Sequence, residues 1–96
     1  GHVNGLGKIK NIEKLGGNWE VEVSFPAELR KYMILEGSVA LDGTSLTIAK
    51  LTPDSLSVSL IPHTLEKTSF SSKKIGDHLN IEVDMVAKYI ENFLSQ

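Results

Sequence analysis

The amino-acid sequence predicts a mainly β protein, an antiparallel barrel or sandwich of short strands that ends in one helix. Six stretches alternate apolar and polar residues with a period of two, and glycine-marked turns separate several of them. Such short strands expose unpaired edges unless the sheet closes on itself or packs on another sheet. The 96 residues, of which 41% are hydrophobic, suffice for one domain with a modest core.

The first third of the chain contains two predicted strands and one helical turn. Gly1–Gly7 holds three glycines in seven residues, so we expect a loop or an irregular edge. Lys8–Lys14 alternates imperfectly and is predicted to be a strand, which the turn Leu15–Asn18 ends. Trp19–Phe25 alternates cleanly and is a second strand. The proline after it suits the first turn of a helix, which we expect over Ala27–Met33.

A hairpin forms the centre of the sequence. The β-prone pieces Ser38–Leu41 and Thr44–Leu51 flank the dipeptide Asp42-Gly43, and Asp-Gly between alternating residues is typical of a tight turn with two positive φ angles. Along the second piece, Ser45 and Thr47 fall on the face opposite to the apolar residues. Two hydroxyls in a row indicate either a solvated strand face or a row of hydrogen-bonding groups for a ligand.

The last third of the chain contains two further strands and a helix. Ser55–Leu60 alternates three serines, expected to point outward, with apolar residues that point inward. One helical turn is expected over His63–Thr68 and a polar loop over Ser71–Lys74, before the strand His78–Val83. From Met85 to Leu94, apolar residues recur with helical spacing. This helix needs a partner surface on the barrel, on a second subunit, or on both.

Composition excludes several classes of function. The net charge is −2 and the charges are interspersed, which argues against a nucleic-acid or anionic-membrane surface. There is no cysteine, and the three histidines do not have the spacing of metal ligands. No apolar run approaches 18 residues. We therefore expect a soluble, cytoplasmic protein that uses no metal.

Six sequence motifs, spread over the whole chain, resemble one protein family. In order, they are GHV-x-G at 1–5, KY at 31–32, GSVALDGTSLT at 37–47, LIPHTLEKT at 60–68, KKIGD at 73–77 and NIEVD-x-x-AKY at 80–89. Together they are similar to the second, C-terminal lumazine-binding domain of riboflavin synthase. The resemblance implies a small six-stranded antiparallel Greek-key barrel with short connecting helices over residues 1–84, followed by a C-terminal helix over residues 85–95.

The resemblance also implies an activity. Riboflavin synthase converts two molecules of 6,7-dimethyl-8-ribityllumazine into riboflavin and 5-amino-6-ribitylamino-uracil, without a cofactor. This chain would supply half of a composite site, with the N-terminal barrel of the same enzyme as its partner. The family assembles as a homotrimer through the C-terminal helix. The alternative is a non-catalytic lumazine- or flavin-binding protein, like the fluorescent relatives of the family.

Two groups of polar residues match positions of the family that touch the substrate. Ser45 and Thr47 match hydroxyls that face the ring, and Ser45 also counts among the catalytic positions. Ile61, His63 and Thr64 match the segment beside the ring and the ribityl chain. Two alternatives remain open: Thr64 is equally well placed to cap the helix that follows Pro62, and His63 to be a surface histidine.

The remaining site residues lie at the two ends of the predicted barrel. Asp84 matches a catalytic carboxylate of the family, although it also precedes a helix, as an N-cap does. His2 matches a histidine that acts as a general acid or base, although Gly-His is also a common remnant of a cloning tag. Val3, Asn4 and Gly5 complete the set of predicted substrate-binding residues. The chain departs from the family at Asn4, where many relatives have Asp, and at position 36, where Glu replaces a frequent Lys.

Overall fold

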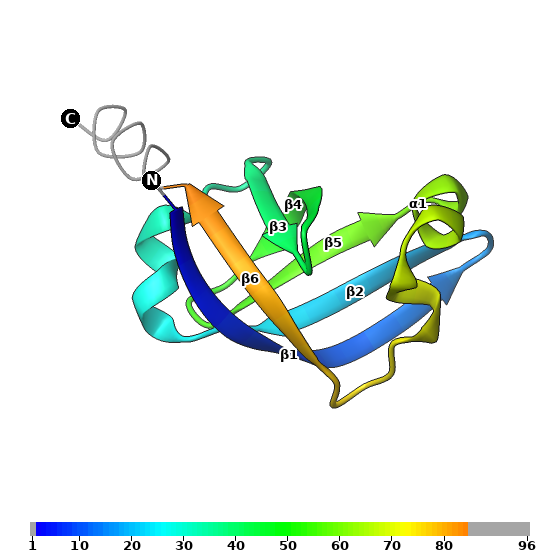
Figure 1. Ribbon diagram of the computed structural model, residues 1–96, viewed down its shortest axis with the longest axis horizontal. Coiled ribbons are helices and arrows are strands. Elements are labelled where there is room, and N and C mark those ends of the chain that lie inside the picture. Colours follow the sequence, from blue (N-terminus) through cyan, green and yellow to red (C-terminus); the bar gives the residue numbers. More distant parts are fainter. Residues whose placement is uncertain (1, 85–96) are drawn as a thin grey trace.

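The protein is a closed barrel of six antiparallel strands, in the order β1-β2-β5-β4-β3-β6 (Figure 1). The computed structural model describes residues 2–84, so the predicted helix from Met85 onward lies outside the described residues. The strands are β1 (His2–Leu15), β2 (Asn18–Ser24), β3 (Ser38–Leu41), β4 (Thr44–Leu51), β5 (Ser55–Leu60) and β6 (His78–Asp84). The helices are η1 (Ala27–Tyr32), α1 (Pro62–Lys67) and η2 (Ser69–Ser72).

The first strand is longer than the sequence pattern predicts. The loop or irregular edge expected over Gly1–Gly7 is wrong from His2 onward, because β1 pairs with β6 from His2 to Lys8 and then with β2 from Lys8 to Leu15. Gly7 lies near this change of partner, where a Cβ atom would approach Ile81 Cδ1 to 2.5 Å and Ser24 O to 2.9 Å. The glycine is therefore a point of close packing inside a strand, and its presence does not signal a loop.

The predicted hairpin turn is confirmed. Asp42 and Gly43 have φ angles of +48° and +83°, the two positive values that a tight turn between β3 and β4 requires. Asp42 also joins this turn to β6, since its N–H donates to Asn80 O at 2.8 Å and its Oδ1 accepts from Asn80 N at 2.7 Å. The hairpin is thus fixed to the neighbouring strand at its tip.

The short helices lie at the ends of the barrel, with α1 and η2 at the end opposite to η1 (Figure 1). Helix α1 begins with Pro62, and Ile61 is its N-cap, so the expectation that Thr64 caps this helix is wrong. Proline occupies the first helical position and needs no donor there, which leaves Thr64 inside the helix. The polar loop predicted after α1 begins instead as η2, whose N-cap Thr68 accepts a hydrogen bond from Phe70 N at 3.3 Å.

The barrel interior is filled by apolar side chains from every strand. The buried residues are Ile9, Val21, Val23, Phe25, Leu29, Met33, Val39, Leu41, Ile48, Leu56, Val58, Leu60, Phe70, Leu79, Ile81 and Val83. The three serines of β5 lie on the opposite face, as predicted, but two of them are not solvated. Ser55 and Ser57 are only 3% and 7% exposed, while Ser59 is exposed. Both serines line one hollow of this outer face together with residues of β1, β2 and β4.

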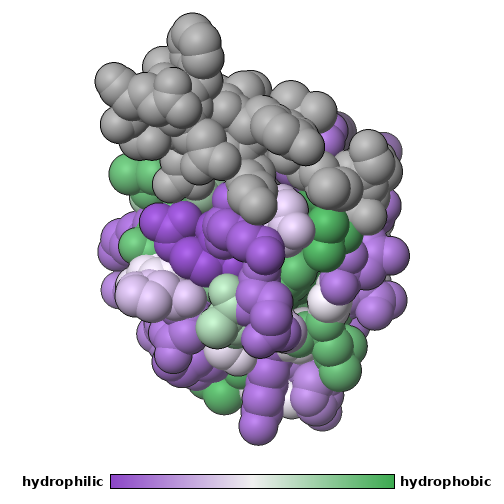
Figure 2. Space-filling view, turned by 90° about the vertical axis from the view of Figure 1, so that its left-hand side faces the viewer, coloured by the Kyte–Doolittle hydropathy of each residue, from purple (hydrophilic) through white to green (hydrophobic). Residues whose placement is uncertain are grey.

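The outer surface is mixed in character. On the end of the molecule that carries η1, hydrophilic residues predominate and the hydrophobic ones form separate patches (Figure 2). Single apolar residues on a surface are normal for a folded domain. No helix in the described part of the chain is long and apolar enough to cross a membrane.

Candidate functional site

The register of four strands aligns several predicted site residues on the outer face of the barrel. Asn4 on β1 pairs with Glu82 on β6, Glu82 with Ala40 on β3, and Ala40 with Ser45 on β4. Residues that pair across strands point to the same face, and neighbouring strands lie about 4.8 Å apart. Asn4, Glu82 and Ser45 therefore form one row across the sheet.

A second row of paired residues runs beside the first. Ser38 pairs with Thr47, and the backbone of His2 pairs with that of Asp84. Each lies two positions along its strand from a residue of the first row, so Ser38, Thr47 and Asp84 face the same side. The structure thus places Ser45, Thr47 and Asp84 on one surface, although they lie on strands far apart in the sequence.

Surface hollows mark where this face is concave. A hollow of about 220 Å³ is lined by Ser45, Asp84, Glu82 and three residues of β3. A second, of about 720 Å³, also borders Glu82 and includes the predicted residues Asn4 and Gly5. Glu82 lines both hollows. Glu82 is not among the residues predicted from the sequence, although the alternation of β6 already puts it on the same outer face as Asp84.

The third hollow connects the predicted residues Val3 and Asn4 to helix η1. It measures about 190 Å³ and is lined on the helix side by Pro26, Leu29, Tyr32 and their neighbours. Gly5 lies close by, and a Cβ atom there would approach Leu29 Cδ1 to 2.6 Å. The absence of a side chain at Gly5 therefore lets η1 pack against β1, a structural reason for glycine that holds whether or not a ligand binds.

The pairing between β4 and β5 stops halfway along β4. The pairs between the two strands run from Leu51–Leu56 to Ile48–Val58. Continued by three residues, this register would place Ser45 opposite Ile61. From Ile48 toward the hairpin turn, β4 and β5 form no further pairs in the described part of the chain. In this region β4 still pairs with β3, and β5 still pairs with β2 as far as Leu60. We call this interruption, between residues 44–47 of β4 and residues 59–64 of β5 and α1, the seam.

Both sides of the seam carry predicted ligand-binding residues. The backbone of Ile48 bonds toward β3, because its N–H donates to Gly37 O and its C=O accepts from Glu36 N. Backbone groups alternate along a strand, so those of Ser45 and Thr47 point toward the seam. Their side chains are exposed, and neither hydroxyl has a hydrogen-bonding partner within the described part of the chain. Both hydroxyls are available to a ligand.

Across the seam, α1 presents the other predicted group. Ile61 is 51% exposed, His63 is exposed and Thr64 is half-buried. The carbonyl of Thr64 accepts hydrogen bonds from Thr68 N at 3.1 Å and from Thr68 Oγ1 at 2.7 Å, which anchors the end of the helix. Extension of the β4–β5 register puts Ile61 and the start of α1 on the side of the seam opposite to Ser45 and Thr47. These residues do not line the hollow that contains Asp84.

A further hollow on the barrel contains none of the predicted site residues. It measures about 260 Å³, lies over β2 and β5, and is lined by Glu13, Glu20, Glu22, Lys50 and polar neighbours. Lys50 Nζ lies 2.9 Å from Glu20 Oε1, and this hydrogen-bonded ion pair raises the pKa of Lys50 above its ordinary value of 10.5. Among residues 2–84 there is also no group of three or more side chains able to hold a metal ion.

Comparison with known proteins identifies the family of the chain. The family model of the lumazine binding domain matches residues 1–84. Riboflavin synthase of Bacillus subtilis is 45% identical over 98% of this chain, and that of Chlamydia trachomatis 46% identical over 92%. The matches span 44% and 42% of those proteins, so the chain covers less than half the length of either relative.

Solved structures of other proteins have the same fold. LumP complexed with 6,7-dimethyl-8-(1'-D-ribityl) lumazine superposes with a TM-score of 0.75 and 25% identity, over 82% of this chain and 43% of that one. LumP complexed with riboflavin has the same fold, with a TM-score of 0.77 and 18% identity over the same two shares. The family match over residues 1–84 and the close relatives lead to one conclusion: the chain belongs to the lumazine-binding domain family.

Proposed function

We propose that this chain binds 6,7-dimethyl-8-ribityllumazine and acts as the C-terminal half of a riboflavin synthase. The observation that carries the proposal is the 45% identity with the Bacillus subtilis synthase over nearly the whole chain. The structure supports it, because Ser45, Thr47 and Asp84 face the same outer side of the barrel, Ser45 and Asp84 line one hollow there, and Ser45 and Thr47 border the seam.

The substrate would bind along this seam. The hydroxyls of Ser45 and Thr47 are available to the polar edge of a pteridine ring, and the backbone groups beside them add donors and acceptors. Ile61 supplies apolar surface, and His63 and Thr64 supply polar groups for the hydroxyl-rich ribityl chain. Each hydrogen bond gained would contribute about 0.5–1.5 kcal/mol net.

The chemistry requires a second substrate molecule from another barrel. In the dismutation, one lumazine gives up a four-carbon unit and becomes 5-amino-6-ribitylamino-uracil, while the other receives the unit and becomes riboflavin. The hollow beside Ser45 and Asp84 measures about 220 Å³, below the roughly 300–1,000 Å³ of a complete small-molecule pocket. We expect an N-terminal barrel to cover this hollow and the adjoining seam, so that one substrate bound on each barrel is held next to the other.

Three residues would take part in proton transfer and alignment. Asp84, on the reactive face, would help to remove a proton from the 7-methyl group of a bound lumazine. His2, whose backbone pairs with Asp84, would serve as a general acid or base near neutral pH. Ser45 would hold the ring in line. Whether Asp84 also caps the predicted helix after it stays a prediction.

The assembly belongs to the same proposal. Strands β3, β4 and β5 are consecutive neighbours and β6 returns beside β3, an order that supports the Greek-key connection. We expect the complete enzyme to be a cytoplasmic homotrimer that associates through the C-terminal helix, predicted over residues 85–95.

A fluorescence titration with 6,7-dimethyl-8-ribityllumazine, with absorbance recorded for riboflavin, tests the proposal. Saturable binding without riboflavin is the result expected of an isolated half-site. Joining the chain to an N-terminal barrel of a family synthase should then restore riboflavin formation. Tight binding without turnover in that two-barrel protein would favour a non-catalytic carrier, and no binding by either protein would refute the proposal.

A further inference from the structure

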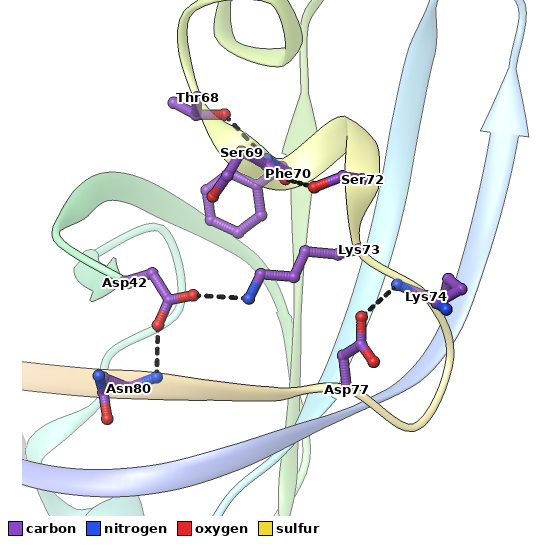
Figure 3. A network of polar contacts seen from close by, with 9 residues as sticks. All are labelled: Asp42, Thr68, Ser69, Phe70, Ser72, Lys73, Lys74, Asp77 and Asn80. Atoms are coloured by element: carbon purple, nitrogen blue, oxygen red, sulfur yellow. Dashed lines mark hydrogen bonds and ion pairs between the residues drawn. The ribbon is translucent and has the colours of Figure 1, made fainter.

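The two segments that border the seam are joined to each other at both of its ends. At one end, β4 and β5 resume pairing at Ile48 and Val58. At the other end, Lys73, which follows η2, reaches the hairpin tip, where its Nζ lies 3.1 Å from Asp42 Oδ2 (Figure 3). The ion pair therefore links the two segments that border the seam, at the end where no strand pairing holds them together.

Lys73 is firmly connected to the α1 side of the seam. Its N–H donates to Phe70 O at 3.0 Å, and Phe70 N donates to Thr68 Oγ1 at 3.3 Å. Thr68 Oγ1 in turn donates to the carbonyl of Thr64 at 2.7 Å. Phe70 is 3% exposed and packs in the core. A short series of hydrogen bonds around a buried aromatic ring thus couples the position of Lys73 to that of Thr64.

Asp42 is equally well fixed on the β4 side. It occupies the hairpin turn, three residues before Ser45, and two hydrogen bonds of 2.7 and 2.8 Å join it to Asn80 on β6. One carboxylate oxygen accepts from Asn80 N and the other faces Lys73 (Figure 3). The position of Asp42 therefore determines where the first residues of β4 lie.

We propose that the Asp42–Lys73 ion pair sets the spacing across the seam and so positions Ser45 and Thr47 against α1 for binding of the ligand. This inference rests on the proposed lumazine-binding function. Asp42 and Lys73 act as positioning residues, through the two segments that they join. Without the pair, the hairpin keeps its bonds to β6, but the α1–η2 segment loses its only ionic connection to the hairpin among the described residues.

The Asp42–Lys73 pair is partly buried, so its loss should have a measurable effect on ligand affinity. The side chains of Lys73 and Asp42 are 24% and 25% exposed, so water and salt screen them less than a fully exposed pair. Small changes in the distance between two groups that hold one ligand weaken both sets of contacts. We expect the dissociation constant for lumazine to rise roughly three- to tenfold when the pair is broken, which converts to about 0.7–1.4 kcal/mol.

The test uses two variants that break the pair in different ways. In Asp42→Asn, the side-chain oxygen still accepts from Asn80 N, but the negative charge is lost. In Lys73→Met, the apolar stem is kept and the ammonium is lost, whereas Lys73→Arg keeps the charge and should restore binding. The matched control is Lys50→Met, which breaks the ion pair between Lys50 and Glu20 in a different part of the barrel.

Two readouts separate this inference from the proposed function. The first is hydrogen exchange of the ligand-free protein, in which Lys73→Met should speed exchange at Thr68 and Phe70 at least about threefold more than at Leu51, since the α1–η2 segment is released while the hairpin keeps its bonds to β6. The second is the lumazine titration, in which Asp42→Asn and Lys73→Met should bind more weakly than Lys73→Arg and Lys50→Met.

Each outcome decides the inference. Faster exchange at the seam together with weaker binding supports it. Unchanged exchange at Thr68 and Phe70, or unchanged lumazine affinity in both charge-removing variants, overturns it. If the wild-type chain itself does not bind lumazine, the proposed function fails, and the exchange comparison alone decides whether the pair holds the two sides of the seam together.

Discussion

Substitution of Gly7 by alanine should destabilise the barrel, in contrast to the same change at Gly5 on the same strand. A Cβ atom at Gly7 would lie 2.5 Å from Ile81 Cδ1, 2.8 Å from Val23 Cγ1 and 2.9 Å from Ser24 O. The last contact is with the backbone of Ser24, which pairs with Lys8 of β1 on one side and with Ser55 of β5 on the other. Overpacking of this kind costs about 1–3 kcal/mol, and the stiffer unfolded chain offsets about 0.4–1 kcal/mol of it.

The expected net loss for Gly7→Ala is therefore about 1.5 kcal/mol, or a fall in Tm of roughly 6–12 °C for a domain of this size. At Gly5 the close contacts are two atoms of the Leu29 side chain, at 2.6 and 3.4 Å, so a terminal methyl of a buried leucine would have to shift but no backbone atom would. Gly5→Ala should therefore change stability by less than about 1 kcal/mol.

Urea denaturation, followed by the fluorescence of Trp19, measures both variants under the same conditions. The slope with denaturant should stay constant, so that the shift in midpoint reports stability alone. The reasoning is refuted if Gly7→Ala is as stable as Gly5→Ala, because backbone Ser24 O would then have moved without cost.

Three further predictions concern polar groups. Thr47→Val should weaken lumazine binding about two- to tenfold through loss of one hydroxyl, with unfolding midpoints unchanged because Thr47 is exposed; equal affinity would remove Thr47 from the site. Ser55→Ala should lower the free energy of unfolding by about 1 kcal/mol, because the buried Ser55 has its Oγ 2.7 Å from Thr52 Oγ1. A double-mutant cycle with Thr52→Ala should show coupling between the two hydroxyls. The pKa of Lys50 is raised in the folded state, chiefly by the hydrogen bond and charge of Glu20, so its stabilising contribution is present below pH 10.5 and is lost as the pH rises through the folded pKa. NMR titration should show the shift, and Glu20→Gln should reduce it, with Glu13 and Glu22 left to act on Lys50.

Local sequence patterns predicted most of the barrel, because alternation and turn chemistry act over a few residues. The Asp42-Gly43 turn and the alternation from Trp19 to Phe25 needed no information from distant residues. The error at the start of β1 has the opposite cause. Glycines there serve contacts with Ile81 and Leu29, which are remote in the sequence, and a local pattern rich in glycine looks like a loop.

The candidate site was predictable one residue at a time but not as an arrangement. The motifs singled out Ser45 and Asp84, yet only the register through Ala40 and Glu82 shows that they share a face. Glu82 was missed because a glutamate on the polar face of a strand is ordinary. The pair of Asp42 with Lys73 was missed because it joins residues 31 positions apart, a relation that no local spacing contains.

The pairing of the first strand with the last has a consequence for folding. The β1–β6 pairs run from Lys8–His78 to His2–Asp84, so the barrel closes through contacts between residues 70 to 82 positions apart, and such contacts are slow to form. Hairpins such as β3–β4 can form early, while β1 and β6 come together late. Asn4 and Glu82 become neighbours only in that step. A ligand that needs both strands would bind the native state alone, so its concentration should raise the unfolding midpoint and favour the completed barrel.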